Sequence, residues 1–183
     1  MQKYISEYNK ALDNYFNVED SVNTEKAKLK EQKKLDKITD SVLAEKNKEL
    51  INTLNGASIN ATSKLSEIKK NMLNDYQEAQ RPSGDKLDME EVALLNSGIK
   101  FTAEELVDKF NKHKGNTTMQ RLYSDYAEAK ELRIGFPSAK QQEEDINLLL
   151  GRSIDAVNAL GDNYWKRMLR SDSRNDFIDT VFY

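Results

Sequence analysis

Hydrophobic positions divide the first 80 residues into three stretches. Near the amino terminus, apolar side chains recur every three or four residues and form one broad stripe: Tyr4, Ile5, Tyr8, Ala11, Leu12, Tyr15 and Phe16. From 18 to 49 they thin to a narrow row among dense charges of both signs, which is typical of a loose coiled coil or a helix crossing solvent. From 50 to 79 the helical spacing returns. With no proline and only Gly56 before residue 81, the pattern predicts a helical arm over 1–80.

Two alternatives remain for the path of this arm. Asn55-Gly56 favours a turn, because Gly costs about 1 kcal/mol of helix propensity relative to Ala. Ser58 and Ser63 are both suited to cap a new helix. The arm therefore either folds back at 55–58 into an antiparallel hairpin or continues as one helix, which would extend on the order of 110 Å.

A region with closely spaced helix-start and helix-stop signals follows the arm. Arg81-Pro82-Ser83-Gly84-Asp85 ends the helix, and four helix-start signatures then pair an N-cap residue with Glu or Gln three residues later: Asp88 with Glu91, Thr102 with Glu105, Thr117 with Gln120, and Ser138 with Gln141. The stops at Gly98, Gly115 and Gly135 match these starts. They predict short helices near 89–96, 103–113 and 118–132.

These signals define an all-α fold with three parts. The arm (1–80) precedes a capped three-helix module (81–137), and a domain over 138–183 holds one long helix, 139–169, and an aromatic tail. Within that helix, Gly151 and Gly161 mark either a close helix crossing or a bend. Composition agrees with long solvent-exposed helices, because charged residues make up 32% of the chain and there are only 7 Gly and 2 Pro.

Composition also limits the chemistry. The chain has no cysteine, so disulfides and thiolate zinc sites are excluded. The first residues lack the apolar run of a signal peptide, and no stretch approaches a membrane span, so we expect a soluble protein that is neither secreted nor membrane-inserted. A net charge of −3 with evenly mixed signs disfavours nucleic acid as a partner, although the residues around Lys114-Gly115 invite comparison with a helix-turn-helix.

No catalytic constellation is visible in the sequence. The single histidine, His113, lies between two lysines at a predicted helix end, so a capping or surface role is the simpler interpretation. The chain offers it no second histidine or cysteine with which to share a metal. We therefore expect a protein that is not an enzyme and uses no cofactor or metal.

Aromatic residues at the two ends are the candidate partner-binding residues. At the first end we expect Tyr4, Tyr8, Leu12, Tyr15 and Phe16 to form an interface, because the arm has little globule of its own to pack against. At the second end, Phe182 and Tyr183 close an aromatic tail that is seldom left in water. Trp165, by contrast, is expected in the core.

One segment supports a family comparison. Residues 94–129, LLNSGIKFTAEELVDKFNKHKGNTTMQRLYSDYAEA, resemble a segment of small structural proteins of tailed phages of Gram-positive bacteria, in which a helical arm precedes a compact helical module. The resemblance rests on the SGIKFT entry, the NTTM cap and the DYAE helix. It implies a scaffold-like, internal capsid or connector-associated virion protein.

That resemblance sets the expected function. It implies a homo-oligomeric or multicopy protein that contacts itself, the capsid or the connector through helices, located in the virion or the bacterial host cytoplasm. The alternative is a helical binding module that inhibits or regulates a host protein.

Overall fold

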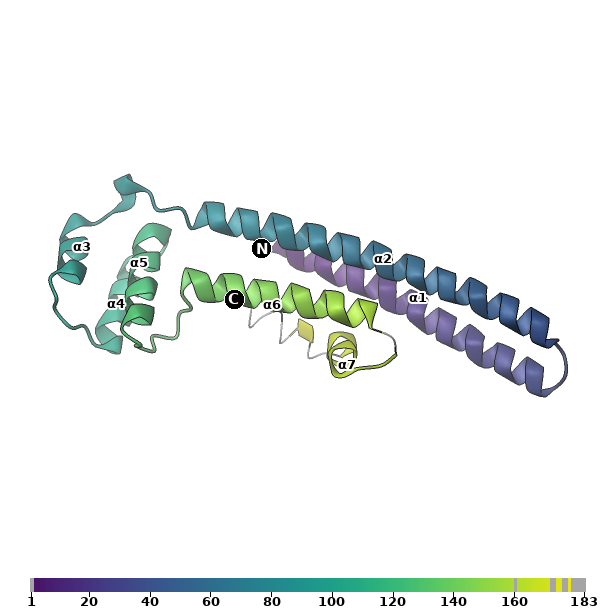
Figure 1. The fold of residues 1–183 in the computed structure, drawn as a ribbon. Coiled ribbons are helices and arrows are strands. Elements are labelled where there is room, and N and C mark those ends of the chain that lie inside the picture. The colour runs from purple at the N-terminus through teal and green to yellow at the C-terminus, as the bar shows by residue number, and fades with distance from the viewer. Residues whose placement is uncertain (1, 160, 172–173, 176–177, 179–183) are drawn as a thin grey trace. The chain divides into compact units, whose positions relative to one another are not determined.

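The protein is all-α. A computed structural model describes residues 2–159, 161–171, 174–175 and 178, and every regular element in this part of the chain is helical (Figure 1). The elements are α1 (Gln2–Lys34), α2 (Asp40–Ala79), the 3₁₀ turn η1 (Gly84–Lys86), α3 (Met89–Asn96), α4 (Ala103–Lys112), α5 (Thr117–Ala129), α6 (Ala139–Asn158) and α7 (Tyr164–Arg170). The predicted fold class is confirmed.

The chain forms two compact units whose boundaries differ from those predicted. Unit 1 combines Met1–Lys70 with Leu148–Tyr183, and unit 2 is the continuous segment Asn71–Asn147. Helices α2 and α6 each run from one unit into the other. The C-terminal residues therefore belong with the N-terminal arm, whereas the sequence pattern assigned them to a separate part.

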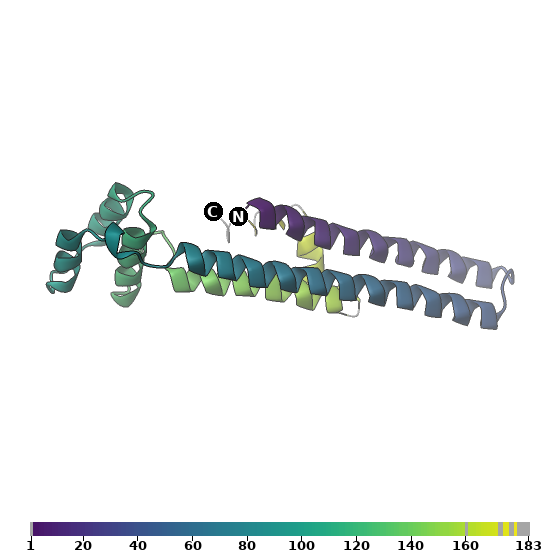
Figure 2. The same ribbon diagram turned by 90° about the horizontal axis from the view of Figure 1, so that it is seen from above.

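Unit 1 is built on an antiparallel hairpin of α1 and α2, which lie side by side (Figure 2). The reversal occurs between Lys34 and Asp40, and α2 passes through Asn55-Gly56 without a break. Neither sequence alternative is therefore right: the arm does fold back into a hairpin, but between Lys34 and Asp40, and α2 continues through 55–58. A single glycine costs too little helix propensity to break a helix of 40 residues whose apolar face is packed.

The observed turn has its own local chemistry. Asp36 takes the left-handed conformation with φ 52°, and the Lys37 N–H donates to the Gln32 carbonyl at 2.9 Å, as in a Schellman cap. Thr39 then caps α2 by accepting from the Val42 N–H at 3.3 Å. Glycine usually fills the left-handed position, so Asp36 gave no clear sequence signal.

Within unit 1, residues from α6 and α7 complete a core on the hairpin. Tyr8 and Ser153 share a hydrogen bond of 2.8 Å, and the Ser58 hydroxyl donates to the Val157 carbonyl at 3.2 Å. The buried hydrophobic side chains come from every helix of this unit and include Leu12, Phe16, Val22, Leu29, Ala61, Leu65, Ile68, Leu149, Leu150, Ala156, Val157 and Leu169. The arm thus packs on the chain's own C-terminal part.

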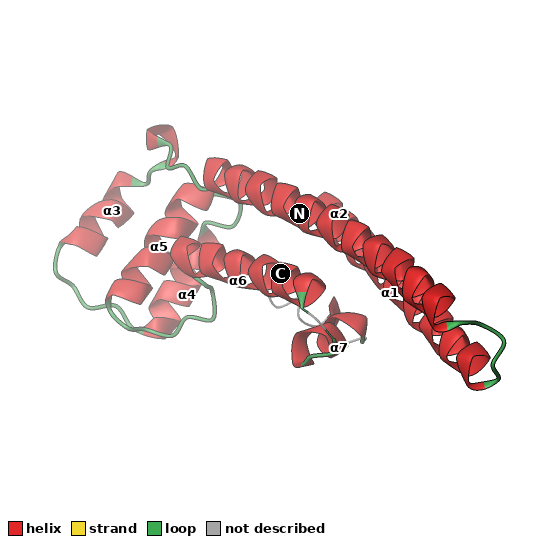
Figure 3. Ribbon diagram, turned by 45° about the vertical axis from the view of Figure 1, so that its right-hand side comes forward, coloured by secondary structure: helices red, strands yellow, loops and turns green. Residues whose placement is uncertain are grey.

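The predicted last helix, 139–169, is in fact two helices (Figure 3). The helix α6 ends at Asn158, Gly161 takes φ 84°, and the Asn163 side chain caps α7 by accepting from the Lys166 N–H at 2.9 Å. A turn at positive φ followed by an N-cap residue ends one helix and starts another. Gly151 stays helical, and no atom lies within 4 Å of where its Cβ would be, so it marks no close crossing.

Unit 2 contains the short helices whose starts and stops were predicted from the sequence. Asp88 caps α3, Thr102 and Glu105 form the predicted capping box of α4, and Ser138 accepts from the Gln141 N–H at 3.1 Å. At α5 the cap is Asn116, one residue before the predicted Thr117. The shared core is Leu106, Met119, Tyr123, Ala127 and Ile134, with partly buried side chains around it.

Candidate functional site

The buried charges of unit 1 are the starting point for a site. Lys166 of α7 is only 2% exposed, and Glu19 of α1 is 8% exposed. Burying a charged group is costly unless it is paired and hydrogen-bonded, so each must have partners inside the fold.

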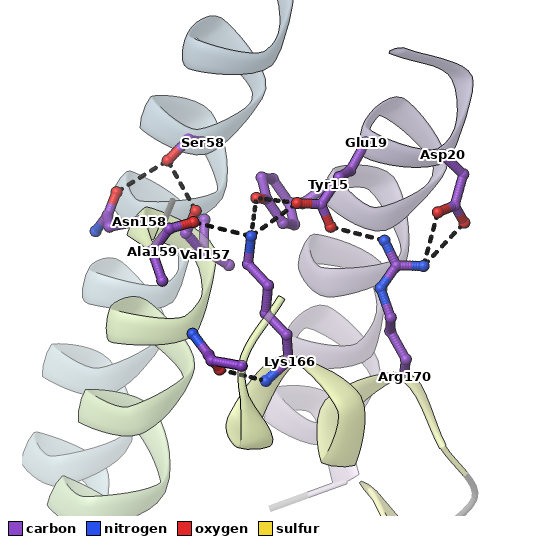
Figure 4. A network of polar contacts seen from close by, with 10 residues as sticks. Tyr15, Glu19, Asp20, Ser58, Val157, Asn158, Ala159, Lys166 and Arg170 are labelled. Carbon is purple, nitrogen blue, oxygen red and sulfur yellow. Dashed lines mark hydrogen bonds and ion pairs between the residues drawn. The ribbon is translucent and has the colours of Figure 1, made fainter. Parts of the chain in front are cut away.

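Lys166 satisfies all three of its donor positions (Figure 4). Its Nζ donates to Glu19 Oε1 at 2.7 Å, to Tyr15 Oη at 3.1 Å and to the Ala159 carbonyl at 2.9 Å. That carbonyl directly follows the end of α6, where a helix dipole favours a cation. One lysine therefore ties α7 to α1 and to the end of α6.

Arg170 occupies the other side of Glu19. Its Nη2 donates to Glu19 Oε2 at 2.7 Å, and its Nη1 donates to the two carboxylate oxygens of Asp20 at 2.7 and 3.0 Å. The guanidinium also lies 4.5 Å from the centre of the Phe16 ring, within cation–π range. We call Glu19, Asp20, Lys166 and Arg170 the α1–α7 ion network.

The network holds its groups charged. Burial alone would lower the pKa of Lys166, but its hydrogen bonds to Glu19 and Tyr15 outweigh this effect, so its pKa lies above the ordinary value. Burial alone would raise the pKa of Glu19, but hydrogen bonds from Lys166 and Arg170 bring it below the ordinary value. A lysine kept protonated is neither a base nor a nucleophile, so this arrangement docks α7 and does not favour covalent chemistry.

The structure places five predicted partner-binding residues in the core. Tyr4, Tyr8, Leu12, Tyr15 and Phe16 are all buried, because α6 and α7 pack back onto α1. The reason for expecting them at an interface, an arm without a core of its own to pack against, is therefore wrong.

The other aromatic predictions have separate outcomes. Phe182 and Tyr183 lie outside the described residues. Trp165 is half-buried rather than in the core, beside the Tyr164 ring and the Arg152 guanidinium.

Sequence reasoning missed the ion network. The usable signal was the four-residue spacing of Lys166 and Arg170, which puts two cations on one face of α7. Arg174 also pairs with α1, donating to Asp13 at 2.7 Å. The partner carboxylates lie about 150 positions earlier in the chain, so the spacing alone names no partner for these cations.

A groove lies beside the network. It has a volume of about 840 Å³ and is lined by α1, α2, α7 and the Gly161-Asp162 turn. Its floor includes Ile51 and Leu54 of α2, and Ile51 is 48% exposed. Its α1 side includes Asn23 and Lys26. We call this the hairpin groove.

Unit 2 has a smaller buried charge. Glu91 is paired with Lys109, and with Lys112 at 3.4 Å, and these bonds hold its pKa below the ordinary value. His113 is the C-cap residue of α4 and is half-buried, with its ring 5.7 Å from that of Tyr123. These are contacts that hold α3, α4 and α5 together.

Two further searches bear on function. Among the described residues, no group of three or more His, Asp or Glu side chains could hold a metal ion. Within the same part of the chain, no helix has the length and apolarity needed to cross a membrane.

Comparison with known proteins gave no relative: no family model, no curated protein and no solved structure matches this chain.

Proposed function

We propose that this protein is a non-enzymatic structural or assembly protein of a tailed-phage virion, scaffold-like, internal to the capsid or associated with the connector. It acts through helix-mediated contacts with itself or with capsid or connector proteins. The observation that carries the proposal is the α1–α2 hairpin, whose end nearest the turn keeps apolar side chains in solvent.

These apolar side chains lie in the hairpin turn and on α2. Leu35 and Val42 are exposed near the hairpin turn, and Ile51 is exposed at the groove. Val22 and Leu29, on the same half of α1 as the turn, are buried. Exposed apolar residues on a long hairpin are typical of a surface that another helix covers in an assembly.

Two more observations support the proposal. The first is the resemblance to phage structural proteins that we infer from the sequence of residues 94–129, a segment within unit 2. The second is that the buried ion pairs around Lys166 and Glu91 each join two helices, α1 with α7 and α3 with α4.

Mass spectrometry of purified phage particles and of their assembly intermediates tests the proposal. We expect the chain at several copies per particle or per intermediate. Its absence from both, together with a strictly monomeric state in sedimentation, would contradict the proposal. Capture of a specific protein from uninfected host lysate in that case would favour the alternative, a helical module that regulates a host protein.

A further inference from the structure

We propose that the hairpin groove receives an amphipathic helix with an acidic flank, contributed by another protein. This inference rests on the proposed function, in which the chain works through helix contacts, and it names the chemical class of the partner.

The groove follows the end of α6 along the same face of α2. The Ser58 and Thr62 hydroxyls of α2 donate to the Asn158 side chain at 2.9 and 3.2 Å, so α6 ends over this part of α2. Ile51 and Leu54 lie seven and four residues before Ser58, on the same face of α2, and they form the groove floor. A helix placed there would extend the packing of α6 toward the hairpin turn.

The floor is apolar enough to need cover. Ile51 is 48% exposed and Leu54 is half-buried, although both belong to the face of α2 that is buried further along the helix. An apolar strip in a groove of about 840 Å³ fits the apolar face of one helix.

Lysines extend the α1 wall of the groove toward the hairpin turn, while the paired carboxylates Glu19 and Asp20 lie in the wall itself. Glu19, Asn23 and Lys26 line it at intervals of four and three residues, and Lys30 and Lys33 continue the same spacing toward the turn. Lys34 adjoins this row at four residues from Lys30. We call Lys26, Lys30, Lys33 and Lys34 the lysine row.

Most of this row forms no ion pair with the residues that the structure describes. Lys33 pairs with Asp40 at 2.9 Å, whereas Lys26, Lys30 and Lys34 form no ion pair with any residue that the structure describes. Lys30 lies four residues from both Lys26 and Lys34, a spacing at which like charges destabilise a helix. A carboxylate-bearing partner would relieve this repulsion.

On the opposite wall of the groove, formed by α7, the arginines are already paired with carboxylates of the chain. Arg167 pairs with Asp162 at 2.8 Å, and Arg170 pairs with Glu19 and Asp20. The carboxylates of the incoming helix should therefore lie on the flank that faces α1.

Charge also distinguishes this partner from two others. A symmetric contact with a second copy would bring two lysine rows together, which is repulsive. Phosphates of a nucleic acid would pair with the lysines but would leave Ile51 and Leu54 uncovered. An acidic amphipathic helix matches both the lysine row and the apolar floor.

The test uses the full chain and a designed fluorescent peptide of about 18 residues, or five helical turns. The peptide carries a leucine stripe with one flank of glutamates, and a second peptide has lysine at each glutamate. By fluorescence anisotropy at low salt, we expect the acidic peptide to bind at least tenfold more tightly than the basic one. Equal binding, or no binding of the acidic peptide, overturns the proposal.

Two pairs of matched variants locate the contact. Lys26→Glu with Lys30→Glu should weaken binding of the acidic peptide at least tenfold, whereas Lys10→Glu with Lys28→Glu makes the same charge change on exposed residues of α1 outside both the groove lining and the lysine row and should not. Ile51→Ser should weaken binding severalfold, and Ile59→Ser, on the same helix but outside the groove lining, should leave it unchanged. Circular dichroism establishes that each variant is folded. Equal losses within either pair overturn the proposal.

Other outcomes separate the competing partners. Arbitrary duplex DNA that binds and loses affinity in the Lys26→Glu, Lys30→Glu variant would replace the proposal with nucleic-acid binding. A dimer that this variant abolishes in sedimentation would replace it with self-association. If the variant enters particles normally, the virion assignment stands while the groove proposal fails.

Discussion

At the scale of single residues, the side chain that contributes most to the docking of α7 is Lys166. Its amine reaches three acceptors from α1 and from the end of α6, and its neighbour one turn later, Arg170, binds the other oxygen of the same carboxylate. Each oxygen of the Glu19 carboxylate is therefore paired with a different cation. Removing either cation would leave the buried Glu19 carboxylate with one of its two ion pairs.

The first prediction tests that dependence. Lys166→Met keeps an unbranched side chain, one atom shorter, but removes the charge, so it should lower the free energy of unfolding by about 3 kcal/mol, because Glu19 loses its most buried partner. Arg167→Met on the same helix removes an exposed ion pair and should change it by less than about 0.5 kcal/mol. Urea denaturation at neutral pH measures both. Equal effects would mean that burial adds nothing to the Lys166 contact.

The second prediction concerns pH. Because the pKa of Glu19 is lower in the folded protein than in the unfolded chain, its contribution to stability is present at neutral pH and is lost as pH falls through the folded pKa. Glu19→Gln cannot titrate. The stability difference between wild type and this variant should therefore be largest near pH 7 and shrink below about pH 4. A difference that stays constant from pH 7 to pH 3 would contradict this account.

At the scale of helices, local signals explain most of what the sequence predicted. The caps at Asp88, Thr102 and Ser138 depend on residues three positions apart, so they can be recognised without knowing the fold. The hairpin turn and the end of α5 could not be recognised this way, because Asp36 and Glu131 occupy left-handed positions that usually hold glycine. The ion network joins residues about 150 positions apart and depends wholly on the tertiary fold.

The third prediction follows from the end of α5. Glu131 has φ 56°, and the Leu132 N–H donates to the Ala127 carbonyl at 2.8 Å, which is the Schellman arrangement. Glu131→Gly should raise the free energy of unfolding by about 1 kcal/mol, since glycine adopts this conformation without strain. The same change three residues earlier, Glu128→Gly, lies within the helix and should lower it by about 1 kcal/mol. Thermal or urea unfolding should give opposite signs.

The fourth prediction compares two glycines. Gly56 lies inside α2 with no atom within 4 Å of where its Cβ would be, so Gly56→Ala should stabilise the protein by about 1 kcal/mol. Gly161 has equal space but a φ of 84°, so Gly161→Ala should destabilise it. A destabilising Gly56→Ala would indicate that the helix is not continuous through Asn55-Gly56.

At the scale of the whole molecule, unit 1 is assembled from both ends of the chain. Its α1 residues are covered by side chains that lie about 150 positions later, while unit 2 is one continuous segment. The three parts predicted from the sequence follow one another along the chain, so that prediction did not include the packing of the C-terminal residues on α1. No local sequence pattern indicates that α6 and α7 pack against α1.

The fifth prediction tests this closure. Truncation after Asn158 removes α7 with the cations of the network and with the buried Leu169 and Ile178. The truncated chain should unfold at lower urea and bind more of the dye ANS, because the aromatic face of α1 loses part of its cover. Full-length Lys166→Met, which loses the ion contact alone, is the matched comparison and should expose less apolar surface. Unchanged ANS binding on truncation would contradict the core described for unit 1.

The split of unit 1 also orders events during synthesis. Unit 2 is complete once residue 147 has left the ribosome, whereas Tyr8 and Leu12 must wait for residues near Leu149 and Ser153. Tyr8 and Ser153 are 145 positions apart, and at ordinary rates of translation that length of chain takes on the order of 10 s to synthesise. During that time α1 presents an uncovered aromatic stripe, so the nascent arm is the part of the molecule most exposed to misassembly, and rapid translation of the last third would favour its recovery in folded form.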